Sequence, residues 1–175
     1  MSVKSATAFG LTSGLEPGMV LLNTTSFSAV ASQSINNVFS ATYDNYKIHI
    51  TLSSTTDSDL QIRLRASGSD NSTASSYNIQ RLLATSTTVS GVRQTDSYFR
   101  AINVRDNDFN AFDFTFFRPF LTKPTLINGL VNYGESSGSG LQFFIGGHNQ
   151  SVSYDGFTFF GPTITGTVRV YGFNN

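Results

Sequence analysis

The sequence contains no cysteine and no tryptophan, and only 13% of its residues are charged. The absence of cysteine excludes disulfide frameworks, zinc–thiolate sites and thiol catalysis. Eleven basic and eleven acidic residues give a formal net charge of zero, so the surface is a poor attractor for nucleic acid or anionic membranes. The sequence contains no run of about 18 apolar residues, so no membrane-spanning helix is predicted. The first ten residues lack the apolar stretch of a signal peptide.

What the chain does contain is a large aromatic component. Sixteen phenylalanines and seven tyrosines indicate an aromatic core of the kind that packs well between β-strands. A chain of 175 residues is most simply one domain. A domain of this size buries roughly 70% of the surface of its unfolded form, so it can fold without a metal or a disulfide.

The stretch 44–67 carries the clearest pattern, because apolar and polar residues alternate strictly in two runs. Tyr46, Ile48, Ile50 and Leu52 share one side of the first run, and Leu60, Ile62 and Leu64 share one side of the second. Side chains alternate across a strand, so each run predicts a strand with one buried face. The short polar segment 53–59 predicts a hairpin that pairs the two strands with each other.

Further short strands separated by Ser-, Gly- and Asn-rich loops are expected along the rest of the chain. They fall at 26–35, 38–43, 77–85, 98–104, 110–120, 126–133, 141–145, 157–160 and 163–173, with 85–96 as a long connection or an edge strand. Gly161–Pro162 predicts a turn between the last two. The pattern predicts an all-β fold, a two-sheet antiparallel sandwich with a jelly-roll arrangement, formed by residues 26–175.

Residues 1–25 lack sustained periodicity and contain Gly10, Gly14, Pro17 and Gly18. We expect an extended N-terminal arm that docks on a neighbouring subunit; a flexible terminus is the alternative. The candidate subunit contacts are Met19, Val20, Leu21 and Leu22 in the arm, and Arg63 and Arg65 on an outer sheet face.

No arrangement of residues predicts catalysis. His49 and His148 lie far apart in unlike settings, and a metal site would need them to converge with a further ligand. The acidic pairs at 57–59 and 106–108 resemble the start of a calcium loop, but the central glycine and distant glutamate of an EF-hand are missing. Turn formation by aspartate explains them more simply. We therefore expect no catalytic residue, no metal and no cofactor.

Several segments resemble small bacteriophage virion proteins with a jelly-roll-like domain, found in tail fibres and on head surfaces. The matching stretches are 43–48 (YDNYKI), 60–68 (LQIRLRASG), 157–160 (FTFF) and 164–172 (ITGTVRVYG). The likeness extends over 40–173 and is a pattern of strands and turns. It implies a non-enzymatic virion structural protein that contacts other virion proteins, such as the major capsid or tail proteins, and assembles as a homo-oligomer, with a trimer as one form.

Two placements in the virion follow from this resemblance. Head decoration is favoured, because the chain has no heptads, repeats or shaft of the kind that precede a fibre tip. The alternative is a tail or tail-fibre component that binds a host surface glycan or receptor. Its candidate ligand residues are Asp70, Asn71, Tyr77, His148, Asn149 and Tyr154, which lie in or beside loops. A glycan hydrolase using Glu135 or Asp155 is a third, remoter alternative.

Overall fold

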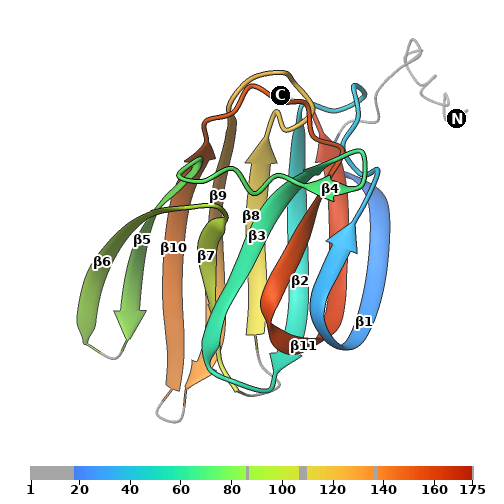
Figure 1. The fold of residues 1–175 in the computed structure, drawn as a ribbon. Coiled ribbons are helices and arrows are strands. Elements are labelled where there is room, and N and C mark those ends of the chain that lie inside the picture. Colours follow the sequence, from blue (N-terminus) through green and yellow to red (C-terminus); the bar gives the residue numbers. More distant parts are fainter. Residues whose placement is uncertain (1–17, 86, 107–109, 136–137, 175) are drawn as a thin grey trace, which may run out of the picture.

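The computed structural model describes residues 18–85, 87–106, 110–135 and 138–174, and every regular element in them is a β-strand (Figure 1). None of these residues forms a helix that could cross a membrane. The strands are β1 (Val20–Ile35), β2 (Asn45–Ser54), β3 (Ser58–Ala66), β4 (Ser69–Asp70), β5 (Tyr77–Thr85), β6 (Thr88–Asp96), β7 (Phe99–Val104), β8 (Asn110–Phe117), β9 (Thr125–Glu135), β10 (Gly138–His148) and β11 (Gly156–Phe173). The predicted all-β class is confirmed.

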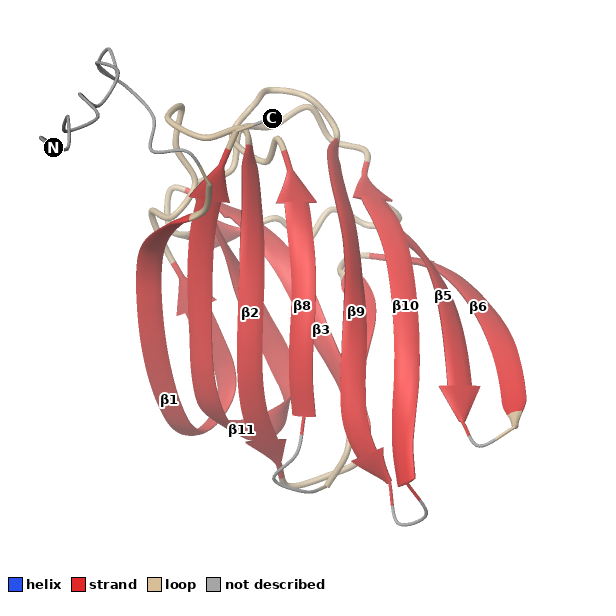
Figure 2. Ribbon diagram, turned by 180° about the vertical axis from the view of Figure 1, so that it is seen from behind, coloured by secondary structure: helices blue, strands red, loops and turns tan. Residues whose placement is uncertain are grey.

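The strands form one antiparallel sheet in the order β4-β3-β11-β2-β8-β9-β10-β5-β6, with β1 on β11 and β7 on β3. The sheet curls, so that β3 and β7 lie in front of β8 and β9 in Figure 1 and behind them in Figure 2. The hydrogen bonds thus join these strands into a single curled sheet. The finer expectation, a two-sheet jelly roll, stays a prediction.

The predicted hairpin between β2 and β3 is wrong. Instead, β11 pairs with both strands: Gly156–Phe160 with β3, and Ile164–Phe173 with β2. Alternation along a strand fixes which face is buried, but it carries no information about the neighbouring strand. The two alternating runs therefore share a core without pairing with each other.

The predicted turn at Gly161–Pro162 is also wrong, because β11 runs through it. The chain bends there and changes its partner from β3 to β2. Gly161 has a φ of 130°, which side-chain-bearing residues rarely adopt, and a Cβ atom there would lie 2.9 Å from the Asp59 carbonyl oxygen. Pro162 removes one ladder donor at the bend. Together these residues curl the sheet without ending the strand.

The predicted strand at 38–43 is wrong, because these residues form the connection between β1 and β2. The Val38 and Phe39 N–H groups both donate to the Asp155 carbonyl instead of to a neighbouring strand.

The remaining strand predictions differ mainly in length. β10 continues through Gly146–Gly147 to His148, because both glycines stay in the ladder to β5 and β9. β8 ends at Phe117, where Arg118 takes a φ of 54° just before Pro119. Within the predicted 85–96 segment, Thr88–Asp96 form edge strand β6, one of the two alternatives expected.

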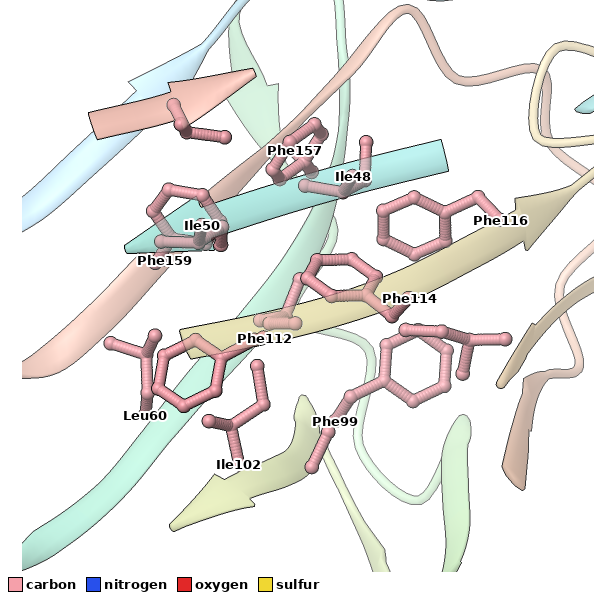
Figure 3. Packing of buried hydrophobic residues seen from close by; sticks show 14 of the residues in the cluster. Ile48, Ile50, Leu60, Phe99, Ile102, Phe112, Phe114, Phe116, Phe157 and Phe159 are labelled. Atoms are coloured by element: carbon pink, nitrogen blue, oxygen red, sulfur yellow. The ribbon is translucent and has the colours of Figure 1, made fainter. Parts of the chain in front are cut away.

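The core lies inside the curl and is aromatic. Phe112, Phe114 and Phe116 project inward from β8 and meet β7, β3 and β11 (Figure 3). The Phe116 ring lies 5.5 Å from Phe114 in an edge-on arrangement, a favourable geometry for aromatic pairs. Gly129 of β9 makes room for this packing, since a Cβ there would lie 2.5 Å from the Phe114 Cβ and 2.6 Å from the Phe144 ring.

Part of the expected N-terminal arm belongs to the sheet. Val20 to Thr25 form the first part of β1 and pair with Val168–Gly172 of β11. The segment 1–17 lies outside the described residues. Among the residues that are described, β1 is therefore a 16-residue strand that pairs with β11 alone.

Candidate functional site

A groove of about 790 Å³ lies on the outer face of the sheet, over β5, β9 and β10. Its apolar side chains include Leu126 of β9, Ile145 of β10 and Phe117 at the end of β8. Leu126 and Ile145 are about half exposed, although they sit on regular strands. The floor of the groove is therefore apolar and exposed to solvent, and a ligand or a protein surface could cover it.

Polar side chains border this floor. Asn128 and Gln80 lie directly across from Ile145 on the two neighbouring strands, and Arg93 of β6 is the next residue in the same row. Asn78 lies across from Gly147 on the neighbouring strand. Amides and a guanidinium around an apolar floor can bind hydroxyl-rich or amide-bearing groups through hydrogen bonds.

Gly146 and Gly147 help to shape the groove where β10 approaches its end. Both remain in register with β5 and β9. A Cβ at Gly147 would lie 3.3 Å from the Leu126 side chain, so a larger residue would crowd this end of the floor. The sequence suggested a strand end at these glycines, whereas the structure shows a depression in a continuous strand.

The predicted ligand residues do come together, but in the interior of the fold. Tyr154 Oη lies 2.5 Å from His148 Nε2 and accepts a hydrogen bond of 2.8 Å from Asn71 Nδ2. Tyr77 Oη donates to the Asn71 carbonyl at 2.7 Å, and its ring stacks 4.0 Å from the His148 ring. Tyr77, His148 and Tyr154 are fully buried. We call these four residues the His148 cluster.

The remaining two predicted ligand residues are also used within the fold. Asp70 accepts hydrogen bonds from Arg65 and from Thr158 Oγ1. The Asn149 backbone N–H donates to the Ser76 carbonyl at 2.9 Å, and Asn149 also lines the groove. The loop at 67–76 is thereby tied to the segment that follows β10. The hydrogen bond to Ser76 fixes the backbone of Asn149 at the border of the groove.

Burial determines the charge state of the His148 cluster. It lowers the pKa of His148 to about 4, against a smaller opposing contribution from the Ser76 backbone, and raises the pKa of Tyr154 to about 12. Burial also raises the pKa of Tyr77. At neutral pH all three rings are therefore uncharged.

We expect acid to destabilise the fold through His148. Because its pKa is about 4 in the folded chain and the ordinary value for histidine is 6.5, the unfolded chain binds more protons between these values. The stability that the neutral His148 contributes is therefore fully present above about pH 6.5. As the pH falls toward 4, the free energy of unfolding declines by up to about 3 kcal/mol. Urea unfolding at pH 7 and pH 4.5 measures this difference.

A His148→Gln variant is the comparison for that measurement. It should be less stable at neutral pH, but its stability should fall less between pH 7 and 4.5 because the imidazole is gone. A His49→Gln variant keeps His148 and should keep the loss. Equal losses in the wild-type protein and in His148→Gln would show that His148 does not cause the acid sensitivity.

A second buried polar cluster joins β3, β5 and β7. Arg81 is buried and donates to Asp59 Oδ1 and to Asn103 Oδ1, both at 2.9 Å. Its other terminal nitrogen lies 3.4 Å from Gln94 Oε1. Gln142 of β10 accepts from the Asn103 backbone N–H at 3.3 Å and donates to the Ala101 carbonyl. The cluster closes the curl of the sheet, and both terminal nitrogens of Arg81 have partners there, whereas its buried Nε has none among the described residues.

The two arginines predicted as subunit contacts are held by the chain itself. Arg65 bonds Asn36, Asp70, Thr158 and the Gly68 carbonyl. Arg63 donates to the Ser97 carbonyl at 3.1 Å and stacks 4.6 Å from the Phe160 ring centre. Sequence reasoning had no signal for this aromatic partner, because strand pairing brings it from the far end of the chain.

The predicted apolar contacts, in contrast, are open to solvent. Met19, Leu21 and Leu22 are 60%, 52% and 36% exposed, and Val20 is partly buried. We call Met19, Leu21 and Leu22 the β1 start.

In the acidic turns, the carboxylates of Asp57 and Asp59 already accept hydrogen bonds from donors of the same chain. Asp57 accepts hydrogen bonds from the Asp106 backbone N–H and from Arg105, and both lower its pKa. Asp59 accepts the hydrogen bond from Arg81 in the second buried polar cluster. Within the part of the chain that the structure describes, no group of three or more His, Asp or Glu side chains could hold a metal ion. Asp108 and the side chain of Glu135 lie outside that part.

Sequence reasoning missed the groove, although a signal was present. In β10 the outward residues Leu141, Phe143 and Ile145 alternate with the inward residues Gln142 and Phe144. A strand that is apolar on both faces predicts cover on both sides. The described residues of one copy cover only the core side.

Comparison with protein-family models, curated proteins and solved structures finds no match to this chain. The function has to be argued from the surfaces described above.

Proposed function

We propose that this protein is a non-enzymatic structural protein of a bacteriophage virion that decorates the capsid surface. The resemblance in the strand and turn pattern supports the virion, and the jelly-roll arrangement is part of the same proposal. The observation that carries the decoration role is the β1 start, where Met19, Leu21 and Leu22 are exposed together. Exposed apolar residues at the beginning of an edge strand suit a contact with a neighbouring capsid protein.

The rest of the surface is compatible with a crowded particle. The chain has zero formal net charge, so neighbouring copies do not repel each other strongly. β1 pairs with β11 on one side only, which leaves its other edge without a strand among the described residues. Such an edge can extend a sheet across a protein–protein contact.

Binding to undecorated heads of the encoding phage tests this proposal. Wild-type protein should bind saturably, and a Met19→Asp/Leu21→Asp variant should bind at least roughly tenfold more weakly, because charges replace apolar contact area. Both side chains are exposed, so the variant should retain its unfolding midpoint. Truncation at residue 25 is unsuitable, because residues 20–25 pair with β11.

Val89→Asp is the matched control. Val89 is 70% exposed and lies on β6, at the other end of the strand order from β1 and β11. It should bind heads like the wild-type protein. Absence of saturable binding by the wild-type protein would contradict decoration, and equal binding by all three proteins would remove the β1 start from the contact.

A second candidate is a tail component that binds a host surface glycan. The groove favours it, because Asn78, Gln80 and Asn128 surround an apolar floor, and sugars offer both hydroxyl groups and apolar faces to such a site. A glycan array is the test. Retention of one glycan class that is lost in Asn128→Ala/Gln80→Ala would support this candidate, and no retention would contradict it.

A further inference from the structure

Six large apolar side chains form one exposed patch on the outer face of β5, β9 and β10. In Figure 2 the outer side of β9 and β10 is toward the viewer, and β5 lies to their right. The six side chains are Leu82, Leu126, Leu130, Leu141, Phe143 and Ile145, and each is 41% to 57% exposed. We call this set the β9–β10 face. Strand register makes it contiguous, since Phe143 lies between Leu130 on β9 and Leu82 on β5.

The patch is large for a monomer. Side chains of this size present on the order of 200 Å² when fully open, so six at half exposure present roughly 600 Å². A monomeric protein rarely exposes more than a few hundred square ångströms of contiguous apolar surface. A standard interface buries about 800 Å² on each partner, so this face supplies most of what a stable pair needs.

The patch itself carries no charged side chain, which favours a second copy as the occupant, because an uncharged apolar face can be buried against itself without leaving a charge unpaired. On one side of the patch Asp113 of β8 lies across from Leu130 and pairs with His49 and Lys47 of its own chain. On the other side Arg93 of β6 lies across from Gln80. A two-fold axis along β10 exchanges these two sides, so the apolar patch meets itself and the two Arg93 side chains do not face each other.

We propose that the β9–β10 face is a two-fold interface between two copies of this chain, with Phe143 and Ile145 at its centre. The proposal goes beyond the decoration role and does not depend on it, because the β1 start is a different surface. The proposal also accounts for the groove, because its floor residues Leu126 and Ile145 belong to the same face. In this arrangement the groove is closed by the partner copy.

Sedimentation analysis of the full chain tests the interface. Wild-type protein should sediment as a dimer, at twice the 19.0 kDa of one chain. Phe143→Asp should raise the dimer dissociation constant by roughly 30-fold or more, as expected for an aromatic anchor at the centre of an interface. Leu121→Asp is the matched control, because Leu121 is 40% exposed and lies in the loop after β8, outside the patch. It should remain dimeric.

A single introduced cysteine places the axis. The chain has no cysteine of its own, so Ile145→Cys carries the only thiol. Two such thiols near a two-fold axis should form a disulfide-linked dimer with oxidised glutathione as the oxidant, whereas Leu121→Cys should not. This variant leaves Phe143 in place, so it tests the face even if Phe143→Asp fails to fold.

A wild-type protein that stays monomeric at high micromolar concentration would overturn the proposal. A dimer that Phe143→Asp leaves intact, in a protein that keeps its unfolding midpoint, would overturn it as well. Neither result bears on head binding through the β1 start, so the two proposals fail separately.

Discussion

Replacing Phe114 by alanine is expected to lower the free energy of unfolding by about 4 kcal/mol. Phe114 is buried at the centre of β8 and packs between Phe116 and Phe144. The alanine variant lacks the buried apolar contacts of the phenylalanine ring, and the strands cannot close the cavity that remains. Urea unfolding followed by tyrosine fluorescence measures the change.

The graded variant Phe114→Leu serves as the control for this prediction. It keeps most of the apolar volume, so its loss should be clearly smaller than that of Phe114→Ala. A loss below about 1 kcal/mol for the alanine variant would contradict a core centred on β8.

Replacing Asp59 by alanine is expected to cost about 3 kcal/mol, because it leaves the Arg81 guanidinium buried without its carboxylate. Arg81 keeps Asn103 and Gln94 as neutral partners, which compensate a charge only in part. The side chains of Arg81 and Asp59 are 7% and 23% exposed, so water cannot replace the lost partner at Arg81. Urea unfolding at pH 7 gives the value.

The double variant Asp59→Ala/Arg81→Met isolates the pair. Removing both charges should be less damaging than removing the carboxylate alone, which makes the two substitutions strongly non-additive. Asp57→Ala is the surface control and should change stability little, because its ion pair with Arg105 is solvent-exposed. Equal effects of Asp57→Ala and Asp59→Ala would contradict a buried role for Arg81.

The strand pattern predicted much of the fold because alternation follows directly from burial. Ile48, Ile50, Leu60 and Ile62 are all in the core, as their spacing indicates. The sequence could not show that β11 separates β2 from β3, since pairing depends on contacts between residues far apart along the chain. It also could not show that Gly161–Pro162 bends a strand, because the same residues favour a turn elsewhere.

The surfaces were harder to predict than the core. Met19, Leu21 and Leu22 were identified as contacts and are exposed, but most of the polar loop residues expected to bind a ligand form the buried His148 cluster. An isolated histidine or tyrosine in a loop gives no sign of whether another loop will cover it. The β9–β10 face was hidden for a related reason: Phe143 and Phe144 are adjacent in sequence and belong to opposite sides of the sheet.

The two proposed contacts can be made at the same time. The β1 start and the β9–β10 face are on different strands of the curled sheet, separated in the strand order by β11, β2 and β8. One can bind a capsid protein while the other binds a second copy. A decoration protein with both contacts would link two attachment points on the particle.

Immunogold labelling of phage particles purified from the source of this sequence is the most direct test of the proposed virion role. An antibody against the folded protein should label the heads, at many positions on each particle. Virions that carry no label, although the antibody binds the isolated protein, would contradict the proposed function.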